Sequence, residues 1–230
     1  MNTSKSTAIY LLLKSKSSIL DSLEEVIKNN KFNYKTFGTE IEPHLEKILV
    51  KIFKSHKIIK NKKDYKIAKD KNEFPDFILK ATKPELILEF KSGNLSKKLN
   101  GKWVKCNNSN NDMGTLNKWE EKINKFGGDN IYYIFIIYDF DNSNQKICDV
   151  QIEPFYKFIG INSDKMLKYR EKDGNLRPKN FNEASPITNL NIFECLLEKT
   201  IIYRSEHIIR RHIENIPKIK RNNFLESLKI

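Results

Sequence analysis

Two short apolar runs joined by a polar link constrain the fold of this chain more than any other feature. Residues 77–79 (Phe-Ile-Leu) and 86–88 (Leu-Ile-Leu) have the composition of strands, and the link 81–85 contains a proline and polar residues that suit a turn. We therefore expect an antiparallel hairpin. Because its strands run in opposite directions, Asp76 before the first run comes to lie beside Glu89 after the second.

Charged residues gather at that end of the hairpin. Glu89 and Lys91 are two positions apart, so in a strand both side chains leave the same face, while Phe90 points the other way. Two carboxylates in one small site, here Asp76 and Glu89, repel each other unless a cation neutralises them, and Mg2+ prefers hard oxygen ligands and water. A neighbouring lysine can orient a water, lower its pKa or stabilise charge on a phosphate. These residue types suit metal-assisted hydrolysis of a phosphodiester.

The order Pro75-Asp76, then Glu89-Phe90-Lys91, resembles the signature of the PD-(D/E)xK nuclease superfamily, which includes type II restriction endonucleases. The resemblance covers about residues 38–140. It implies an α/β fold with a mixed central β-sheet flanked by helices, the restriction-endonuclease-like core. It also implies that Asp76 and Glu89 bind Mg2+ and that Lys91 is the catalytic lysine. The alternative is an ordinary surface hairpin, in which Glu89 and Lys91 form a cross-strand or solvated pair.

A helix is predicted over residues 38–53, with Thr39 as its N-cap and Pro43 in its first turn. Glu42 falls at the edge of the apolar face of this helix. Many restriction enzymes of the superfamily carry a glutamate on the helix before the hairpin, where it contacts the waters of the metal. By that resemblance Glu42 is the candidate, with Glu46 as its substitute. The alternative is an acidic helix start favoured by the helix dipole.

The other expected elements follow from apolar periodicity. They are, in chain order, a helix over 7–30 capped by Ser18 or Asp21, a strand or irregular edge within 54–71, a helix over 115–126, a central strand over 131–138, a strand over 147–152 reached by a hairpin turn, and a mostly helical segment over 190–230. No internal repeat or long Pro/Gly/Ser linker divides the chain. We expect one domain over residues 1–230, with its core at about 38–140 and a basic DNA-contact and C-terminal helical region at about 141–230.

A long loop is expected over residues 92–112, which are rich in Asn, Ser, Gly and Lys. Loops of this length are uncommon in compact domains unless they have a function. Asparagine side chains can hydrogen-bond adenine edges or phosphates, so Asn107 and Asn110 are candidate DNA contacts. The alternative is a mobile insertion.

The chain is basic, with 42 Lys and Arg against 29 Asp and Glu and a formal net charge of +13. This favours a polyanionic partner, nucleic acid first and an anionic membrane surface second, although an AT-rich coding sequence also yields many Lys, Asn and Ile residues. The most concentrated basic segment is 165–179. Arginine suits guanine edges and phosphates, so Arg170, Arg177 and Lys179 are candidate DNA contacts, with a solvated surface as the alternative.

The cysteines and the N-terminal residues indicate a cytoplasmic protein without disulfides. Cys106, Cys148 and Cys195 lie far apart and lack metal-ligand spacing. The apolar run near the N-terminus is broken by Lys14 and has no small-residue cleavage site, and no window is long enough to span a bilayer. We expect no association with a membrane.

These features together predict a Mg2+-dependent type II restriction endonuclease that hydrolyses phosphodiester bonds of double-stranded DNA at a specific short sequence. The resemblance implies a homodimer, because a two-fold symmetric duplex site suits a two-fold symmetric reader with one active site for each strand. One alternative is a structure-specific or repair nuclease on the same core. Another is a DNA-binding module that keeps the fold without catalysis.

Overall fold

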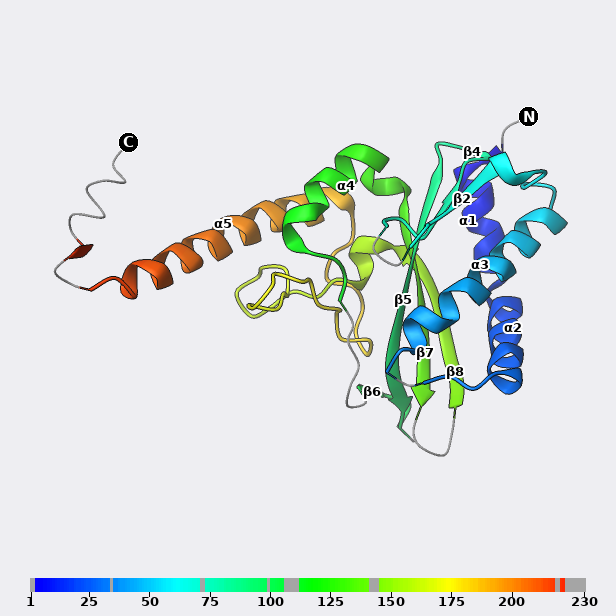
Figure 1. The fold of residues 1–230 in the computed structure, drawn as a ribbon, viewed down its shortest axis with the longest axis horizontal. Helices are drawn as coiled ribbons and strands as arrows, with labels where there is room; N and C mark the ends of the chain where they lie inside the picture. Colours follow the sequence, from blue (N-terminus) through cyan, green and yellow to red (C-terminus); the bar gives the residue numbers. More distant parts are fainter. Residues whose placement is uncertain are drawn as a thin grey trace.

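The computed structural model describes residues 3–33, 35–70, 73–98, 100–105, 112–140, 145–217 and 220–221. The chain forms a mixed sheet of parallel and antiparallel strands with helices on both faces (Figure 1). The predicted α/β class with a mixed central sheet flanked by helices is therefore confirmed. Among the described residues, no helix is both long enough and apolar enough to cross a lipid bilayer.

The central sheet has the strand order β2-β3-β5-β7-β8, with β6 paired to β5. β3 and β5 are antiparallel with Ile78 opposite Ile87, which confirms the predicted hairpin. β5 and β7 are parallel, and β7 and β8 are antiparallel. The strands are β1 (Thr3–Ser4), β2 (Tyr65–Ile67), β3 (Phe77–Leu79), β4 (Thr82–Lys83), β5 (Leu86–Lys97), β6 (Trp103–Lys105), β7 (Ile131–Phe140) and β8 (Gln145–Pro154).

Helices from the two halves of the chain cover opposite faces of the sheet, as Figure 1 shows. The first three helices lie on one face and the last two on the other. They are α1 (Lys5–Lys14), α2 (Lys16–Asn29), α3 (Phe37–Ser55), α4 (Trp119–Phe126) and α5 (Leu190–Glu214). Short 3-10 turns span Lys62–Asp64, Leu116–Lys118, Gly128–Asn130 and Phe155–Phe158. α4 lies in the connection between the parallel strands β5 and β7, as a crossover requires.

Side chains of β5 alternate between the two faces of the sheet, and this alternation decides which of the two hydrophobic cores Glu89 and Lys91 face. Leu88 and Phe90 belong to the core beneath α1, α2 and α3, whereas Ile87 belongs to the core beneath α4 and α5. Because successive side chains of a strand leave opposite faces, Glu89 and Lys91 point to the same side as Ile87. The charged residues thus interrupt the second core rather than the first.

The predicted helix over 7–30 is two helices that meet at Ser15, and the predicted caps were wrong. Ser4 caps α1 by accepting a hydrogen bond from Thr7 N at 3.1 Å, and Ser15 is the N-cap residue of α2. Ser18 and Asp21 instead lie inside α2. Apolar periodicity runs through both helices, so it does not reveal the break.

α3 begins before the predicted Thr39, so the predicted N-cap was wrong and Pro43 lies in the second turn rather than the first. The physical reason is Phe37, which is fully buried and whose ring packs 4.3 Å from Tyr138 and 4.4 Å from Phe140, measured between ring centroids. Burial of this aromatic side chain on β7 extends the helix by one turn beyond the local cap signal.

The prediction of a loop from residue 92 onward was wrong for its first part. β5 continues to Lys97, pairs with β7 through Asn94 and then pairs with β6. Asn94 is buried, and its amide donates to Phe140 O at 3.1 Å while its oxygen accepts from Phe140 N at 3.3 Å. The long neighbouring strand thus compensates for a composition that disfavours strands. Asn107 and Asn110 lie outside the described residues.

Candidate active site

The hairpin brings Asp76 and Glu89 together. Phe77 lies opposite Leu88 in the ladder between β3 and β5, so Asp76 and Glu89 occupy the next facing positions. The carboxylate of Asp76 accepts a hydrogen bond from Phe90 N at 2.5 Å. The structure therefore places the two carboxylates at one end of the hairpin, on the face that α4 covers.

Among the residues that the structure describes, no strand pairs with the sheet edge at which the site lies. One edge of β5 pairs with β7 up to Asn94, but the opposite edge pairs with β3 only up to Leu88. The carboxylate of Asp76 accepts a hydrogen bond from the main-chain N–H of Phe90, just beyond the last backbone pairing between β3 and β5. A carboxylate at this edge can reach a ligand that approaches from outside the sheet.

Glu89 is a buried carboxylate with one oxygen left without a partner. The residue is 8% exposed, and its Oε1 accepts a hydrogen bond from Lys91 Nζ at 2.7 Å. Its Oε2 is buried, and no group among the described residues hydrogen-bonds to it. A buried charged oxygen without a partner is costly, so a cation or a donor at this position would stabilise the site.

The ionisation of Asp76 and Lys91 reflects this crowding. Burial, reinforced by the charge of Glu89, raises the pKa of Asp76 to about 8, against the opposing effects of Lys91 and the N–H of Phe90. Burial lowers the pKa of Lys91, but the carboxylates of Glu89 and Asp76 raise it more, so its net shift is upward. In the absence of a cation, Asp76 is therefore mostly protonated at neutral pH and Lys91 is charged.

Glu42 approaches the same site from α3. The start of this helix lies against the open part of β5, since a Cβ atom at Gly38 would come within 2.7 Å of Ser92 Oγ. Burial raises the pKa of Glu42, the charge of Lys91 lowers it and that of Glu89 raises it. Glu42 is thus within electrostatic reach of the hairpin residues.

Glu46 follows Glu42 one turn later on α3. Burial, and then the negative charge of Glu42, raises the pKa of Glu46 to about 7, while Lys47 lowers it. Its electrostatic link to the site therefore runs through Glu42. Of the two predicted glutamates, Glu42 is the better placed.

Lys122, which is not among the residues predicted from the sequence, reaches the site from α4. Burial lowers the pKa of Lys122 to about 8, and the charges that act on it include those of Glu89, Lys91 and Asp76. One sequence feature could have indicated it: Lys122 follows the buried Trp119 by three residues, so this lysine lies on the otherwise apolar face of its helix.

The donor set fits a Mg2+ ion held by few protein ligands. Among the described residues, no cluster of three or more His, Cys, Asp or Glu side chains could hold a metal on its own. Mg2+, however, is usually held by one or two carboxylates, with waters and substrate phosphates completing its shell. Asp76 and Glu89, with the unpartnered Oε2 of Glu89, meet that requirement.

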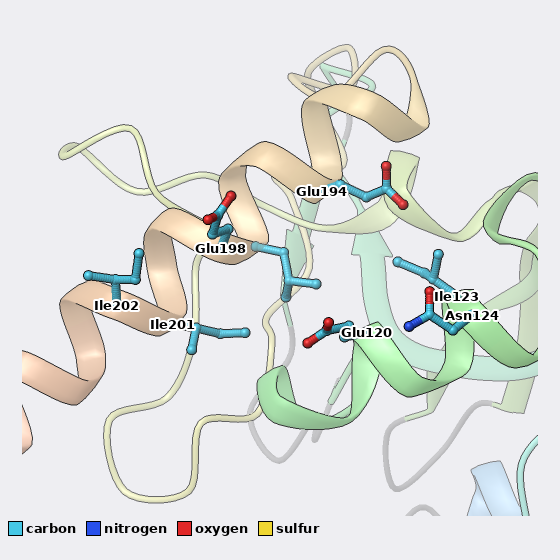
Figure 2. A pocket seen from close by; sticks show the side chains of 8 residues that line it. Glu120, Ile123, Asn124, Glu194, Glu198, Ile201 and Ile202 are labelled. Atoms are coloured by element: carbon cyan, nitrogen blue, oxygen red, sulfur yellow. The ribbon is translucent and has the colours of Figure 1, made fainter.

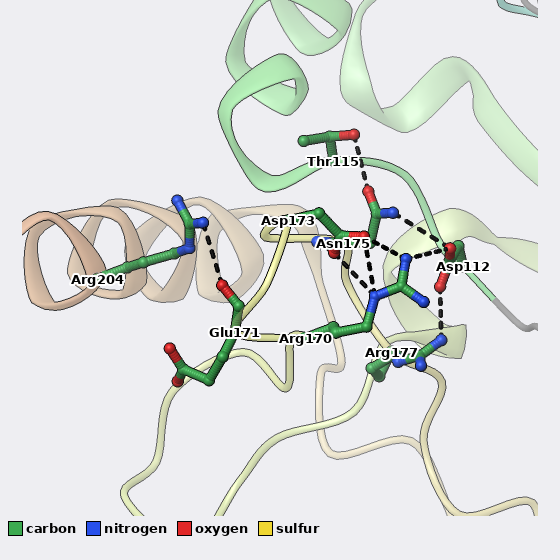
Figure 3. A network of polar contacts seen from close by, with 8 residues as sticks. All are labelled: Asp112, Thr115, Arg170, Glu171, Asp173, Asn175, Arg177 and Arg204. Carbon is green, nitrogen blue, oxygen red and sulfur yellow. Dashed lines mark hydrogen bonds and ion pairs between the residues drawn. The ribbon is translucent and has the colours of Figure 1, made fainter. Parts of the chain in front are cut away.

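Arg170 and Arg177, two of the predicted DNA contacts, meet on one carboxylate (Figure 3). Asp112 accepts a hydrogen bond from Arg177 at 2.5 Å and another from Arg170 at 3.1 Å. Arg170 also pairs with Asp173, and Asn175 donates to Asp112 at 3.2 Å. We call these five residues the arginine network. Their charges balance one another within the protein.

Lys179, the third predicted contact of this segment, is not part of the arginine network. Its ammonium donates to the main-chain oxygen of Glu183 at 2.7 Å. Burial lowers the pKa of Lys179, and the charges of Glu153 and Glu183 raise it. Because a carbonyl oxygen carries no net charge, this hydrogen bond leaves the positive charge of Lys179 in place.

A cavity of about 480 Å3 lies between α4 and α5, apart from the carboxylates of the hairpin. Glu120 of α4 and Glu194 and Glu198 of α5 line it together with apolar side chains (Figure 2). Three glutamates would repel the phosphates of DNA. This cavity is therefore a poor candidate for the site of phosphodiester chemistry.

No protein-family model matches this chain, and no curated protein matches it in sequence. Its function is therefore inferred from the site itself.

Proposed function

We propose that this chain is a Mg2+-dependent endonuclease for double-stranded DNA, of the kind represented by the type II restriction endonucleases of the PD-(D/E)xK superfamily. One observation carries the proposal: the buried carboxylate of Glu89 has one oxygen on Lys91 and the other without a partner, beside Asp76. That is the arrangement expected of a site that binds a hard cation and a phosphate.

Each residue of the site has a defined task in this proposal. Asp76 and Glu89 would hold the ion, which when bound activates a water and neutralises charge on the phosphate. Asp76 must release its proton as the ion binds, since only the carboxylate form is a ligand. Lys91, fixed by Glu89 at 2.7 Å, would orient the attacking water or stabilise the phosphate. Glu42 would hold waters at the side of α3.

The substrate and the assembly are part of the same proposal. The net charge of +13 supports a polyanionic substrate. A homodimer would supply one site for each strand. The outer half of α5 leads away from the sheet in Figure 1 and exposes Ile202, Tyr203 and Ile209, which supports self-association there. An enzyme acting on cellular or phage DNA would work in the cytoplasm.

The test is incubation of the purified protein with unmethylated plasmid and phage DNA in Mg2+. Parallel reactions contain a chelator, Asp76→Ala, or Asp21→Ala as a matched control on the exposed face of α2. Discrete fragments that disappear with the chelator and with Asp76→Ala, but not with Asp21→Ala, are the expected result. A smear lost under the same conditions would indicate a non-specific or structure-directed nuclease. Intact DNA despite tight, salt-sensitive binding would leave only a DNA-binding module.

A further inference from the structure

Lys122 is held beside the hairpin by two aromatic rings. Its Nζ lies 3.8 Å from the ring centroid of Phe74 and 4.9 Å from that of Trp119. These rings also contact each other edge to face, with centroids 6.2 Å apart. Phe74 precedes Asp76 by two residues, so the ammonium is fixed next to the strand end that carries the carboxylate.

The positive charge of Lys122 is not neutralised by a paired carboxylate. Among the described residues, Lys122 forms no ion pair; Glu89 and Asp76 attract its ammonium, whereas Lys91 and Lys118 repel it. The attraction of a cation to an aromatic face offsets only part of the cost of removing an ammonium from water. An anion bound next to the ammonium of Lys122 would neutralise its positive charge.

The neighbouring lysine is in a different state. Lys91 donates a hydrogen bond to Glu89 at 2.7 Å, so the negative charge of Glu89 already offsets the positive charge of Lys91. A DNA phosphate that approaches Glu89 meets a carboxylate whose charge Lys91 already offsets, so further positive charge beside it would favour phosphate binding. Lysine is well suited to this task, because its ammonium acts as a compact point charge toward phosphate.

We propose that Lys122 is a phosphate-positioning residue that binds a backbone phosphate of DNA at the site formed by Asp76, Glu89 and Lys91. The inference rests on the proposed nuclease function and adds a residue from α4 to it. Lys122 would hold the phosphodiester against the open edge of β5, opposite the side from which α3 brings Glu42.

Two variants of Lys122 separate charge from packing. Lys122→Met keeps an apolar stem against Phe74 and Trp119 but removes the charge, whereas Lys122→Arg keeps a charge over the rings. Lys125→Met is the matched control, since Lys125 is an exposed lysine of the same helix. For each protein we would measure the single-turnover cleavage rate in Mg2+. We would also measure DNA affinity in chelator over a series of salt concentrations, and thermal unfolding.

The expected result for Lys122→Met is a cleavage rate lower by about 100-fold, the usual effect of losing one group that stabilises charge in the transition state. Its plot of log affinity against log salt should become shallower by about one unit, because one phosphate contact is lost. Lys122→Arg should keep the wild-type salt slope. Lys125→Met should match the wild type in both measurements.

Lys122→Met with the wild-type salt slope and cleavage rate would overturn the inference and leave Lys122 a packing residue. If Lys122→Met unfolds at the assay temperature, Lys122→Gln, which also removes the charge, decides: a folded glutamine variant with the wild-type salt slope contradicts the phosphate contact. Failure of the nuclease proposal looks different. In that case the wild type cleaves no DNA, while the salt slopes still test Lys122.

Discussion

The carboxylate site of the hairpin and the arginine network are both dense in charge, but the protein balances the charge in only one of them. In the arginine network, hydrogen bonds from Arg170 lower the pKa of Asp173 to about 2, and Asp112 joins Arg170 to Arg177. At the hairpin, burial raises the pKa of Asp76 to about 8, and an oxygen of Glu89 has no partner among the described residues.

This difference separates charges that hold the fold together from charges that are available to a ligand. The bonds of Asp112 span 58 residues to Arg170 and 65 residues to Arg177, so they tie the segment around Asp112 to the basic segment. The hairpin site makes no such tie through Oε2 of Glu89. A dense group of charged residues in a sequence therefore indicates a binding site only where the fold leaves its charge unbalanced.

The largest effect should come from Glu89→Gln, which removes the charge from the central carboxylate. We expect the single-turnover cleavage rate to fall by about 1000-fold or more, since losing a metal ligand removes several kcal/mol of transition-state stabilisation. Mg2+ should also no longer raise the melting temperature. Glu25→Gln, at an exposed position of α2, is the control. Cleavage by Glu89→Gln at the wild-type rate would remove the carboxylate site from the mechanism.

The next largest effect concerns pH in the absence of metal. The unfolded chain releases the proton of Asp76 near its ordinary pKa of 3.8, and the folded protein releases it near 8. Because the folded-state pKa is raised, this contribution to stability is complete below about pH 4 and is lost as pH rises toward 8. Asp76→Asn cannot titrate, so at pH 8 it should be more stable than the wild type by several kcal/mol, since each unit of pKa shift corresponds to about 1.4 kcal/mol.

Urea unfolding of both proteins in chelator at pH 5 and pH 8 measures this effect. The stability advantage of Asp76→Asn should be larger at pH 8 than at pH 5. Adding Mg2+ at pH 8 should stabilise the wild type and reduce the difference. An advantage that does not change between the two pH values would contradict the raised pKa of Asp76.

A smaller effect is expected for Asp112→Asn, which breaks the arginine network. Removing the carboxylate leaves Arg170 and Arg177 without their shared partner, and we expect a loss of about 1–2 kcal/mol in the free energy of unfolding. Cleavage per folded molecule should stay at the wild-type level. Asp164→Asn, at an exposed position of the same region, is the control. A stable variant that no longer cleaves DNA would place the arginine network in the active site.

The smallest effect should separate two of the predicted DNA contacts. Lys179 donates to a carbonyl and keeps its charge, whereas Arg170 is neutralised by Asp112 and Asp173. If both were substituted by glutamine, we expect Lys179→Gln to reduce the salt slope of DNA binding by about one unit and Arg170→Gln to change it less. The salt dependence of DNA binding measures both. The opposite order would show that Arg170 contacts DNA despite its internal partners.

Predictions from local patterns agree with the structure where neighbouring residues decide the outcome. The hairpin, the central strand within β7 and the helix α4 all follow from short apolar runs and turn residues. The predictions failed where distant contacts decide. The start of α3 depends on the contact of Phe37 with β7, and the length of β5 depends on its pairing with β7.

The sequence by itself determined which residue types stand at the end of the hairpin, because strand alternation and an antiparallel turn place Asp76, Glu89 and Lys91 together within one short segment. Only the tertiary structure decided that Lys122 reaches the same site and that Asp112 balances the arginines. The physical reason is the range of the forces involved. Backbone geometry acts over a few residues, whereas burial and charge pairing depend on which distant segments the packed sheet brings together.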